Sequence, residues 1–357
     1  MYERCENFDF ECLNQHTLNL GVFDKNVDPD GNLFNSIETT CNYMTEDQFY
    51  CKVTKKNGLT ILNVNCRSLK NSFDDIKSIV NKSNIIFDAI TLSETWLSDN
   101  DDLSCYSLNN FELYAKNRTG KRGGGVLVYV NNSYECTHLN VYSKAVQDLY
   151  ECVSVEINIP RSKNIVLSCI YRSPGTSIID FSQELCNMCS DFKTKNVVLC
   201  GDFNINLLNI ETCNQTKQFL DMLYSFGIFP LINKPTRITL NTATLIDNIF
   251  TNVMSNSNNG IIVTDTISDH LPIFSQISYE GITIENEVQY KTVRKVTNMS
   301  LSLIKEDLLM CDWTQVNEAT DVNSAYEYFE KTVKQIYDKH CPEKKIKVNY
   351  KQIKNHG

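Results

Sequence analysis

The sequence predicts an α/β sandwich with two β-sheets in its core. Between residues 58 and 283, short β-rich segments outnumber segments with helical periodicity, and this mixture of many strands and few helices favours that arrangement. The chain has 357 residues, of which 42% are hydrophobic and 22% are charged. This composition allows a substantial buried core and excludes collagen-like and fully disordered chains.

Charge and hydropathy narrow the class of protein further. The chain carries 34 basic and 43 acidic side chains, which gives a net charge of −9 at pH 7. No apolar run approaches the roughly 20 residues that cross a bilayer. The start, MYERCENFDFEC, lacks the basic and apolar regions of a secretory signal. We therefore expect a soluble, intracellular protein without a membrane partner.

The fifteen cysteines do not form a recognisable framework. Their number is odd and their spacing is scattered, which argues against a set of disulfides in a chain of this size. Cys186 and Cys189 form a CxxC motif, but both fit the apolar face of a helix and are predicted to be buried thiols. No second CxxC or histidine pair completes a zinc site.

The expected elements follow a polar segment. Residues 1–57 lack sustained periodicity, so we expect a loosely structured leader with room for a short helix near its end. Apolar or alternating runs then predict strands, in order LTILNV, FDAITLSE, GVLVYV, CVSVEI, NIVLSCIY, NVVLCGDF, LIDNIFTN, IIVTD and PIFSQIS.

Helices are expected between and after these strands. Ser72 can cap a helix with its apolar face on residues 73–80. A second apolar stripe on residues 219–226 stops at Gly227. The chain then becomes charged, helical and finally basic over residues 284–357. The expected organisation is a leader (1–57), a main domain (58–283) and a helical, basic linker (284–357).

Eight polar residues lie at or near predicted strand ends, where a sandwich places its loops: Asn65, Glu94, Tyr171, Asp202, Asn204, Asp247, Asp269 and His270. Taken singly, each has an ordinary explanation. A glutamate after a strand is usually a solvated loop residue. Asp202 and Asn204 could bond their own backbone in a turn, and His270 could be a satisfied polar residue.

Together these residues lie in segments that resemble the endonuclease/exonuclease/phosphatase superfamily. The resemblance spans about residues 58–280 and is carried by NVNCRSLKNSFDDI, ITLSETWL, NRTGKRGGGVLVYV, SCIYRSPG, VVLCGDFNINLL, PLINKPTRIT, TLIDNIFTN and ISDHLP. Within the superfamily, the chain is most similar to the apurinic-type endonuclease domain in the second reading frame of LINE-type (non-LTR) retrotransposons. The flanks resemble the leader of such proteins and the stretch before their reverse transcriptase, so we expect a copy truncated before the polymerase.

This resemblance implies a DNase I-like fold, a four-layer α/β sandwich of two packed mixed sheets flanked by helices. It also implies metal-assisted hydrolysis. Glu94 would ligate a divalent cation, Mg²⁺ with Mn²⁺ as the alternative, and Asp269 would complete the metal-facing side. Asp202 would orient or deprotonate the attacking water, and Asn204 would hold phosphate and nucleophile. Nuclear access would follow from the DNA substrate.

The same resemblance assigns the remaining roles. His270, held by Asp247, would bind the scissile phosphate and stabilise the transition state, while Tyr171 and Asn65 would donate hydrogen bonds to phosphate oxygens. Two positions depart from the family pattern. Arg67 stands where some apurinic endonucleases have a metal-binding aspartate, and Asn248 stands where retroelement relatives often have histidine. The first departure makes nicking of intact DNA a better hypothesis than repair of abasic sites.

A basic segment, KNRTGKR at residues 116–122, precedes three glycines. In one interpretation Arg118, Lys121 and Arg122 bind the DNA backbone. In the other, the segment is a solvated hairpin with a glycine-rich bulge. The glycines are not a phosphate-binding P-loop, because no Gly-Lys-Ser/Thr follows them.

The leading hypothesis is a Mg²⁺-dependent endonuclease that nicks one DNA strand and leaves a 3′-hydroxyl to prime reverse transcription. One alternative is another phosphodiesterase or phosphatase of the superfamily, acting on inositol phosphates, lipids or RNA tails. The other is a non-catalytic remnant of a retroelement, kept as a DNA-binding module.

Overall fold

The computed structural model describes residues 40–160, 162–239, 241–253, 257–264, 266–278 and 290–347. The chain divides into two compact units, Met1–Ile282 and Thr283–Gly357. In the described part of the chain, no helix combines the length and apolar character needed to cross a membrane.

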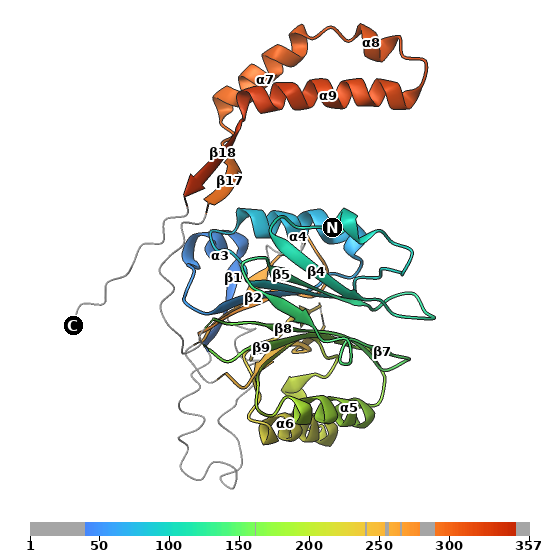
Figure 1. Ribbon diagram of the computed structural model, residues 1–357, viewed down its shortest axis with the longest axis vertical. Coiled ribbons are helices and arrows are strands. Elements are labelled where there is room, and N and C mark those ends of the chain that lie inside the picture. Colours follow the sequence, from blue (N-terminus) through green and yellow to red (C-terminus); the bar gives the residue numbers. More distant parts are fainter. Residues whose placement is uncertain are drawn as a thin grey trace, which may run out of the picture. The chain divides into compact units, whose positions relative to one another are not determined.

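The first unit is built on two packed β-sheets (Figure 1). The first sheet has the strand order β1 (Thr40–Thr45), β15 (Ser257–Val263), β16 (Ile273–Ile277), β2 (Leu59–Asn65), β3 (Ala89–Ser93), β5 (Val126–Asn131), β4 (Phe111–Lys116). The second sheet has the order β11 (Phe229–Pro230), β14 (Asp247–Thr251), β10 (Asn196–Asp202), β9 (Ile165–Arg172), β8 (Tyr150–Ile157), β6 (Cys136–His138), and β7 (Ala145–Val146) also pairs with β8.

Helices cover the outer faces of both sheets. Figure 1 shows α3 (Glu46–Lys52) and α4 (Leu69–Lys82) outside the first sheet, and α5 (Ile178–Asp191) and α6 (Asn214–Ser225) outside the second. The layers are therefore helix, sheet, sheet and helix, which confirms the predicted four-layer α/β sandwich.

The alternation of side chains along β2 explains this layering. All seven residues of β2 are buried. Leu59 and Ile61 belong to the core that contains the facing strands of the second sheet, whereas Leu62 and Val64 pack with residues of α3 and α4. Because successive side chains of a strand point to opposite faces, one apolar run serves two cores.

The α4 helix begins earlier than predicted. Its N-cap is Ser68, and Ser72 lies inside the helix, where its hydroxyl donates to the Ser68 carbonyl at 3.1 Å. The prediction that Ser72 caps the helix was therefore wrong. Leu69 is fully buried against the first sheet, and this contact stabilises an additional turn ahead of the apolar stripe.

Residues 40–52 contain the short helix expected near the end of the leader, α3, and also a strand that was not predicted, β1. β1 pairs in parallel with β15 along its whole length. Thr45 and Gln48 form a reciprocal capping box at the start of α3, and the buried Phe49 ring contacts Phe87 and Phe274. A polar edge strand with so few buried side chains has no hydrophobic periodicity by which it could be recognised. Residues 1–39 of the leader lie outside the described residues.

The thirteen cysteines in the described ranges are free thiols. The prediction of buried thiols on α5 is confirmed for Cys189, whereas Cys186 is only half-buried. The second unit contains α7 (Asn298–Met310), α8 (Thr314–Asn317), α9 (Val322–His340) and the pair β17 (Tyr290–Arg294) and β18 (Glu343–Lys347). A short pair, β12 (Arg237–Ile238) and β13 (Ala243–Thr244), lies in the first unit.

Candidate active site

Strand register brings the predicted site residues to one end of the sandwich. β2 and β3 run in parallel with Asn65 opposite Ser93, so that Glu94 follows directly beside Asn65. In the second sheet, Asp202 lies opposite Tyr171 on one side and opposite Asp247 on the other. Four of the eight predicted residues thus occupy paired strand positions, and Glu94 directly follows a fifth such position, Ser93.

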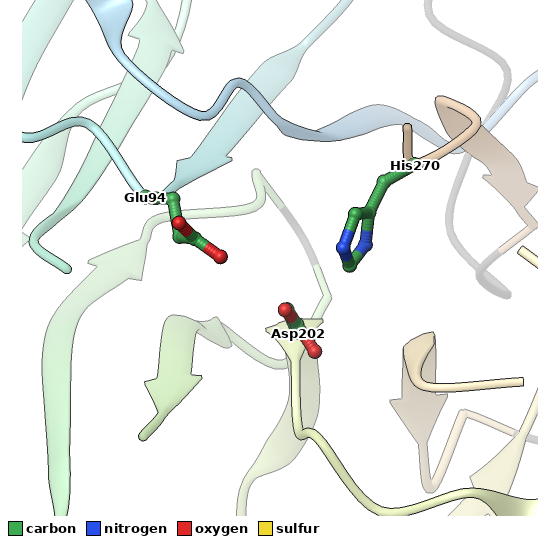
Figure 2. Close-up of side chains that lie close together, drawn as sticks. All are labelled: Glu94, Asp202 and His270. Carbon is green, nitrogen blue, oxygen red and sulfur yellow. The ribbon is translucent and has the colours of Figure 1, made fainter. Parts of the chain in front are cut away.

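Three of the side chains converge at this end. Single ligand atoms of Glu94, Asp202 and His270 all lie within 4.8 Å of one another, and Figure 2 shows the three side chains pointing toward one another from separate segments. The amide of Asn65 joins two of them, donating to Glu94 Oε1 at 3.2 Å and to Asp202 Oδ2 at 2.9 Å. We call Glu94, Asp202 and His270 the central cluster.

His270 is held by a buried carboxylate. Its Nδ1 lies 2.9 Å from Asp247 Oδ2, and both side chains are almost completely buried. The hydroxyl of Thr236 donates to the same oxygen at 2.7 Å. Burial opposes the charged imidazole, but the carboxylates of Asp247, Asp202 and Asp269 outweigh it and raise the pKa of His270 to about 9. His270 is therefore an imidazolium at neutral pH, and its Nε2 remains for another partner.

For Asp202, unlike His270, burial itself raises the pKa. Burial, together with the charge of Asp247, raises the pKa of Asp202 well above its ordinary value. The backbone N–H of Asn204 donates to Asp202 Oδ1 at 2.9 Å. The side-chain amide of Asn204 donates to the Arg172 carbonyl at 2.7 Å. A fixed carboxylate with a raised pKa is a suitable proton acceptor near neutral pH.

Glu94, the third member of the central cluster, lies beside Tyr171. Glu94 has a positive φ of 54°, and its Oε2 accepts a hydrogen bond from Trp96 Nε1 at 3.0 Å. Tyr171 is 4% exposed. Burial, followed by the carboxylates of Glu94 and Asp202, raises the pKa of Tyr171 above its ordinary value, so its hydroxyl keeps the proton that it can donate.

Asp269 lies outside the central cluster, although it precedes His270 in the chain. Its Oδ1 accepts from Arg67 Nη1 at 2.8 Å, and its Oδ2 accepts from Arg237 Nε at 2.8 Å. Burial would raise the pKa of Asp269, but Arg237, His270 and Arg67 together lower it. The predicted metal ligand thus has both oxygens engaged by arginines.

The basic segment divides into one inward and two outward side chains. Arg118 forms two bonds to the buried Glu151, at 2.8 and 3.1 Å, and its guanidinium lies 5.3 Å from the Tyr171 ring centroid. Lys121 is exposed and pairs with Asp148. Arg122 lies over the Trp96 ring at 5.6 Å. Arg118 is thus engaged by a buried carboxylate, and its binding to DNA stays a prediction.

The ion pair of Arg118 leads to a prediction on stability. Replacing Arg118 with alanine leaves the Glu151 carboxylate, only 2% exposed, buried without its guanidinium. We expect a loss of about 3–5 kcal/mol in the free energy of unfolding. Urea unfolding at pH 7 measures this, with the exposed Arg122→Ala as a matched control that should lose less than about 1 kcal/mol. Equal stabilities of the two variants would contradict the assignment of Arg118.

Several residues that support the site were not predicted from the sequence. Trp96 bonds Glu94, Thr236 bonds Asp247, and Ser268 donates to the Asn65 carbonyl at 2.7 Å. All three lie in segments that carry the family resemblance, namely ETWL, KPTRIT and ISDHLP, but none of them was assigned a role. Their hydroxyl and indole groups were the available signal, because a strand-end carboxylate or histidine needs a neighbour to fix its orientation.

The central cluster offers donors suited to a divalent cation. Carboxylate oxygens of Glu94 and Asp202 lie close to each other, and both accept hydrogen bonds from the side-chain N–H group of Asn65. Hard cations such as Mg²⁺ prefer oxygen ligands of this kind and retain several water molecules. The residues present therefore fit a divalent metal ion.

Known proteins resemble this chain over the region that holds the site. A sequence model of the Endonuclease/Exonuclease/phosphatase family matches residues 62–270, a span that includes all eight predicted residues. Similar solved structures include the endonuclease domain of TRAS1, a telomere-specific non-LTR retrotransposon, at 16% identity and a TM-score of 0.49, covering 62% of this chain and 98% of that one.

Two other structures are comparably similar. An AP endonuclease from Archaeoglobus fulgidus is 12% identical, with 62% of this chain and 100% of that chain covered and a TM-score of 0.47. The catalytic domain of Xenopus laevis APE2 is 15% identical, with 62% of this chain and 94% of that chain covered and a TM-score of 0.46. No curated protein matches the chain.

Proposed function

We propose, because the chain belongs to the endonuclease/exonuclease/phosphatase family, that it is a Mg²⁺-dependent endonuclease that nicks one strand of DNA. The observation that carries this proposal is the central cluster, in which a carboxylate with a raised pKa, a second carboxylate and an imidazolium meet within 4.8 Å. Such a set suits hydrolysis of a phosphodiester, which needs a proton acceptor, an oxygen-rich metal site and a cation facing the phosphate.

Each residue has a defined task in this proposal. Glu94 would hold the metal ion, which supplies charge stabilisation to the phosphate when bound. Asn65, whose amide N–H group donates to Glu94, would donate to a phosphate oxygen. Asp202, kept in place by Asn204, accepts the proton of the attacking water. The water oxygen forms a bond to phosphorus while the bond from phosphorus to O3′ breaks, and the departing O3′ takes up a proton from solvent water. The products are a 3′-hydroxyl and a 5′-phosphate.

Preorganised donors face the developing negative charge. The Nδ1 of His270 is fixed by Asp247, so Nε2 binds a phosphate oxygen as the donor of an imidazolium. The neutral hydroxyl of Tyr171 is a second donor beside Glu94 and Asp202. These groups need no rearrangement at the moment of reaction, because buried neighbours already orient them.

The segments that resemble non-LTR retrotransposon endonucleases, such as NCRSL and KPTRIT, support a more specific role. The 3′-hydroxyl would prime reverse transcription by the polymerase of such an element, and the nick would be made in the nucleus. The motif departure at Arg67 supports nicking of intact DNA over repair of abasic sites.

A panel of substrates tests the substrate class. Purified protein with Mg²⁺ is incubated separately with supercoiled plasmid, an oligonucleotide duplex with one abasic site, inositol phosphates and adenylate-tailed RNA. We expect open-circular plasmid as the main product, with ends that a DNA polymerase extends directly. Faster release of phosphate from inositol phosphates would favour the phosphatase alternative, and no turnover of any substrate by folded protein would favour the non-catalytic one.

The two outward side chains of the basic segment give a prediction on DNA affinity. The Lys121→Ala/Arg122→Ala variant is expected to bind duplex DNA more weakly. The slope of log affinity against log salt concentration should become shallower by about one to two. The reason is that Arg122 stacks over Trp96, whose indole bonds Glu94, so the segment borders the site. The matched control is Lys77→Ala/Lys82→Ala on the exposed face of α4. Identical salt slopes for the two variants would remove this segment from the interface.

A further inference from the structure

Two arginines, Arg67 and Arg237, form ion pairs with Asp269, and a contribution to folding stability does not account for them. Arg67 and Arg237 have side chains that are 53% and 41% exposed, whereas Asp269 is 15% exposed. Ion pairs of this exposure typically contribute less than about 1 kcal/mol. One carboxylate also neutralises only one of the two guanidiniums, which leaves a surplus of one positive charge at this place.

Part of each guanidinium remains available. Arg67 uses Nη1, and Arg237 uses Nε and Nη2, in their bonds to Asp269. Within the described ranges, no bond from Nε or Nη2 of Arg67 or from Nη1 of Arg237 to another side chain is found. These donors belong to planar forks that match two oxygens of a phosphate.

Backbone contacts fix both arginines beside the central cluster. The N–H of Arg67 donates to Asn65 Oδ1 at 3.2 Å, and the backbone of Arg67 has a positive φ of 40°. Arg237 forms a β-bridge with His270. The two arginines therefore come from segments 170 positions apart in the sequence, yet both border residues proposed to bind the scissile phosphate.

We propose that Arg67 and Arg237, joined by Asp269, form a binding site for a DNA phosphate adjacent to the one that is cleaved. The site rests on the proposed function, because it positions the same strand relative to His270. Asp269 then acts as the link that holds both guanidiniums in place, and it is not a ligand of the metal ion. We call these three residues the arginine pair site.

DNA binding without turnover tests the arginine pair site directly. Affinity for a short duplex is measured in EDTA at several salt concentrations for the wild-type protein, Arg67→Ala, Arg237→Ala and the exposed Lys217→Ala as control. Each arginine variant is expected to bind DNA about tenfold more weakly, and its slope of log affinity against log salt concentration should be shallower by about one. The affinity of the control should change less than about twofold. Arginine variants that match the control would overturn the proposal.

A charge-neutral variant separates contact from bulk electrostatics. Arg67→Ala/Asp269→Asn has the same net charge as the wild-type protein. We expect its affinity to remain about tenfold low, because the guanidinium that binds phosphate is missing. Recovery to wild-type affinity would show that Arg67 acts only by cancelling the charge of Asp269, and would overturn the phosphate contact.

The single Asp269→Asn variant tests the link against metal binding. If Asp269 joins the arginines, the Mg²⁺ concentration for half-maximal nicking changes less than about twofold, since no metal ligand is lost. A rise of tenfold or more would identify Asp269 as a metal ligand and contradict the proposal. The wild-type protein serves as the reference for the proposed function: if it neither binds nor nicks DNA, that function fails, whereas nicking by the wild type with unchanged arginine variants refutes the arginine pair site alone.

Discussion

Nicking of supercoiled DNA is expected to fall at least about a hundredfold when His270 is replaced by alanine. The substitution removes the imidazolium that Asp247 orients toward the phosphate, and this charge is needed most in the transition state. DNA affinity should change much less, because contacts to the rest of the strand remain. Initial nicking rates and duplex affinity in EDTA measure the two effects separately.

A second histidine provides the matched control for that variant. His138 lies on β6, where its ring packs 5.2 Å from Tyr114. His138→Ala should therefore nick within about threefold of the wild-type rate, provided that it folds. Nicking by His270→Ala at a rate similar to that of His138→Ala would refute the assignment of the site.

Asp202→Asn is expected to lower the nicking rate by a factor of about 10²–10⁴. The asparagine fits the same space and can still accept from Asn204, but it cannot take a proton from water. The pH dependence carries the sharper test. Because the pKa of Asp202 is raised by burial and by Asp247, its deprotonated, active form becomes more abundant as the pH increases, so wild-type nicking should increase with pH through that ionisation.

The Asp202→Asn variant should lose this pH-dependent increase, whereas the exposed Asp74→Asn on α4 should keep it. Rates measured between pH 5 and 9, with folding checked by circular dichroism, give the comparison. A variant that keeps both the wild-type rate and the wild-type pH profile would exclude Asp202 as the proton acceptor.

The sequence was informative where local patterns determine the structure. Strands with buried apolar runs, such as β2 and β10, were recognisable from the sequence. The residues at their ends meet as parallel and antiparallel pairing requires. The predicted superfamily is confirmed by the family match over residues 62–270. The proposed pairing of His270 with Asp247 agrees with the observed 2.9 Å contact.

Pairings between distant segments were not predictable in the same way. Arg118 reaches Glu151 across 33 positions, and Arg67 reaches Asp269 across 202. A basic side chain in a polar segment has the same local pattern whether it faces solvent, DNA or a buried carboxylate. Only the three-dimensional arrangement distinguishes these cases, and it changed the interpretation of Arg118 and Asp269.

The most direct test of the central claim is a plasmid nicking assay with Mg²⁺, with EDTA, and with Glu94→Gln in Mg²⁺. The control is Glu211→Gln, an exposed glutamate beyond β10. We predict open-circular product from the wild-type protein and from Glu211→Gln in Mg²⁺, and at least about a hundredfold less product in EDTA or from Glu94→Gln. Nicking that persists in EDTA, or that proceeds at the wild-type rate in Glu94→Gln, would contradict metal-dependent hydrolysis at the central cluster.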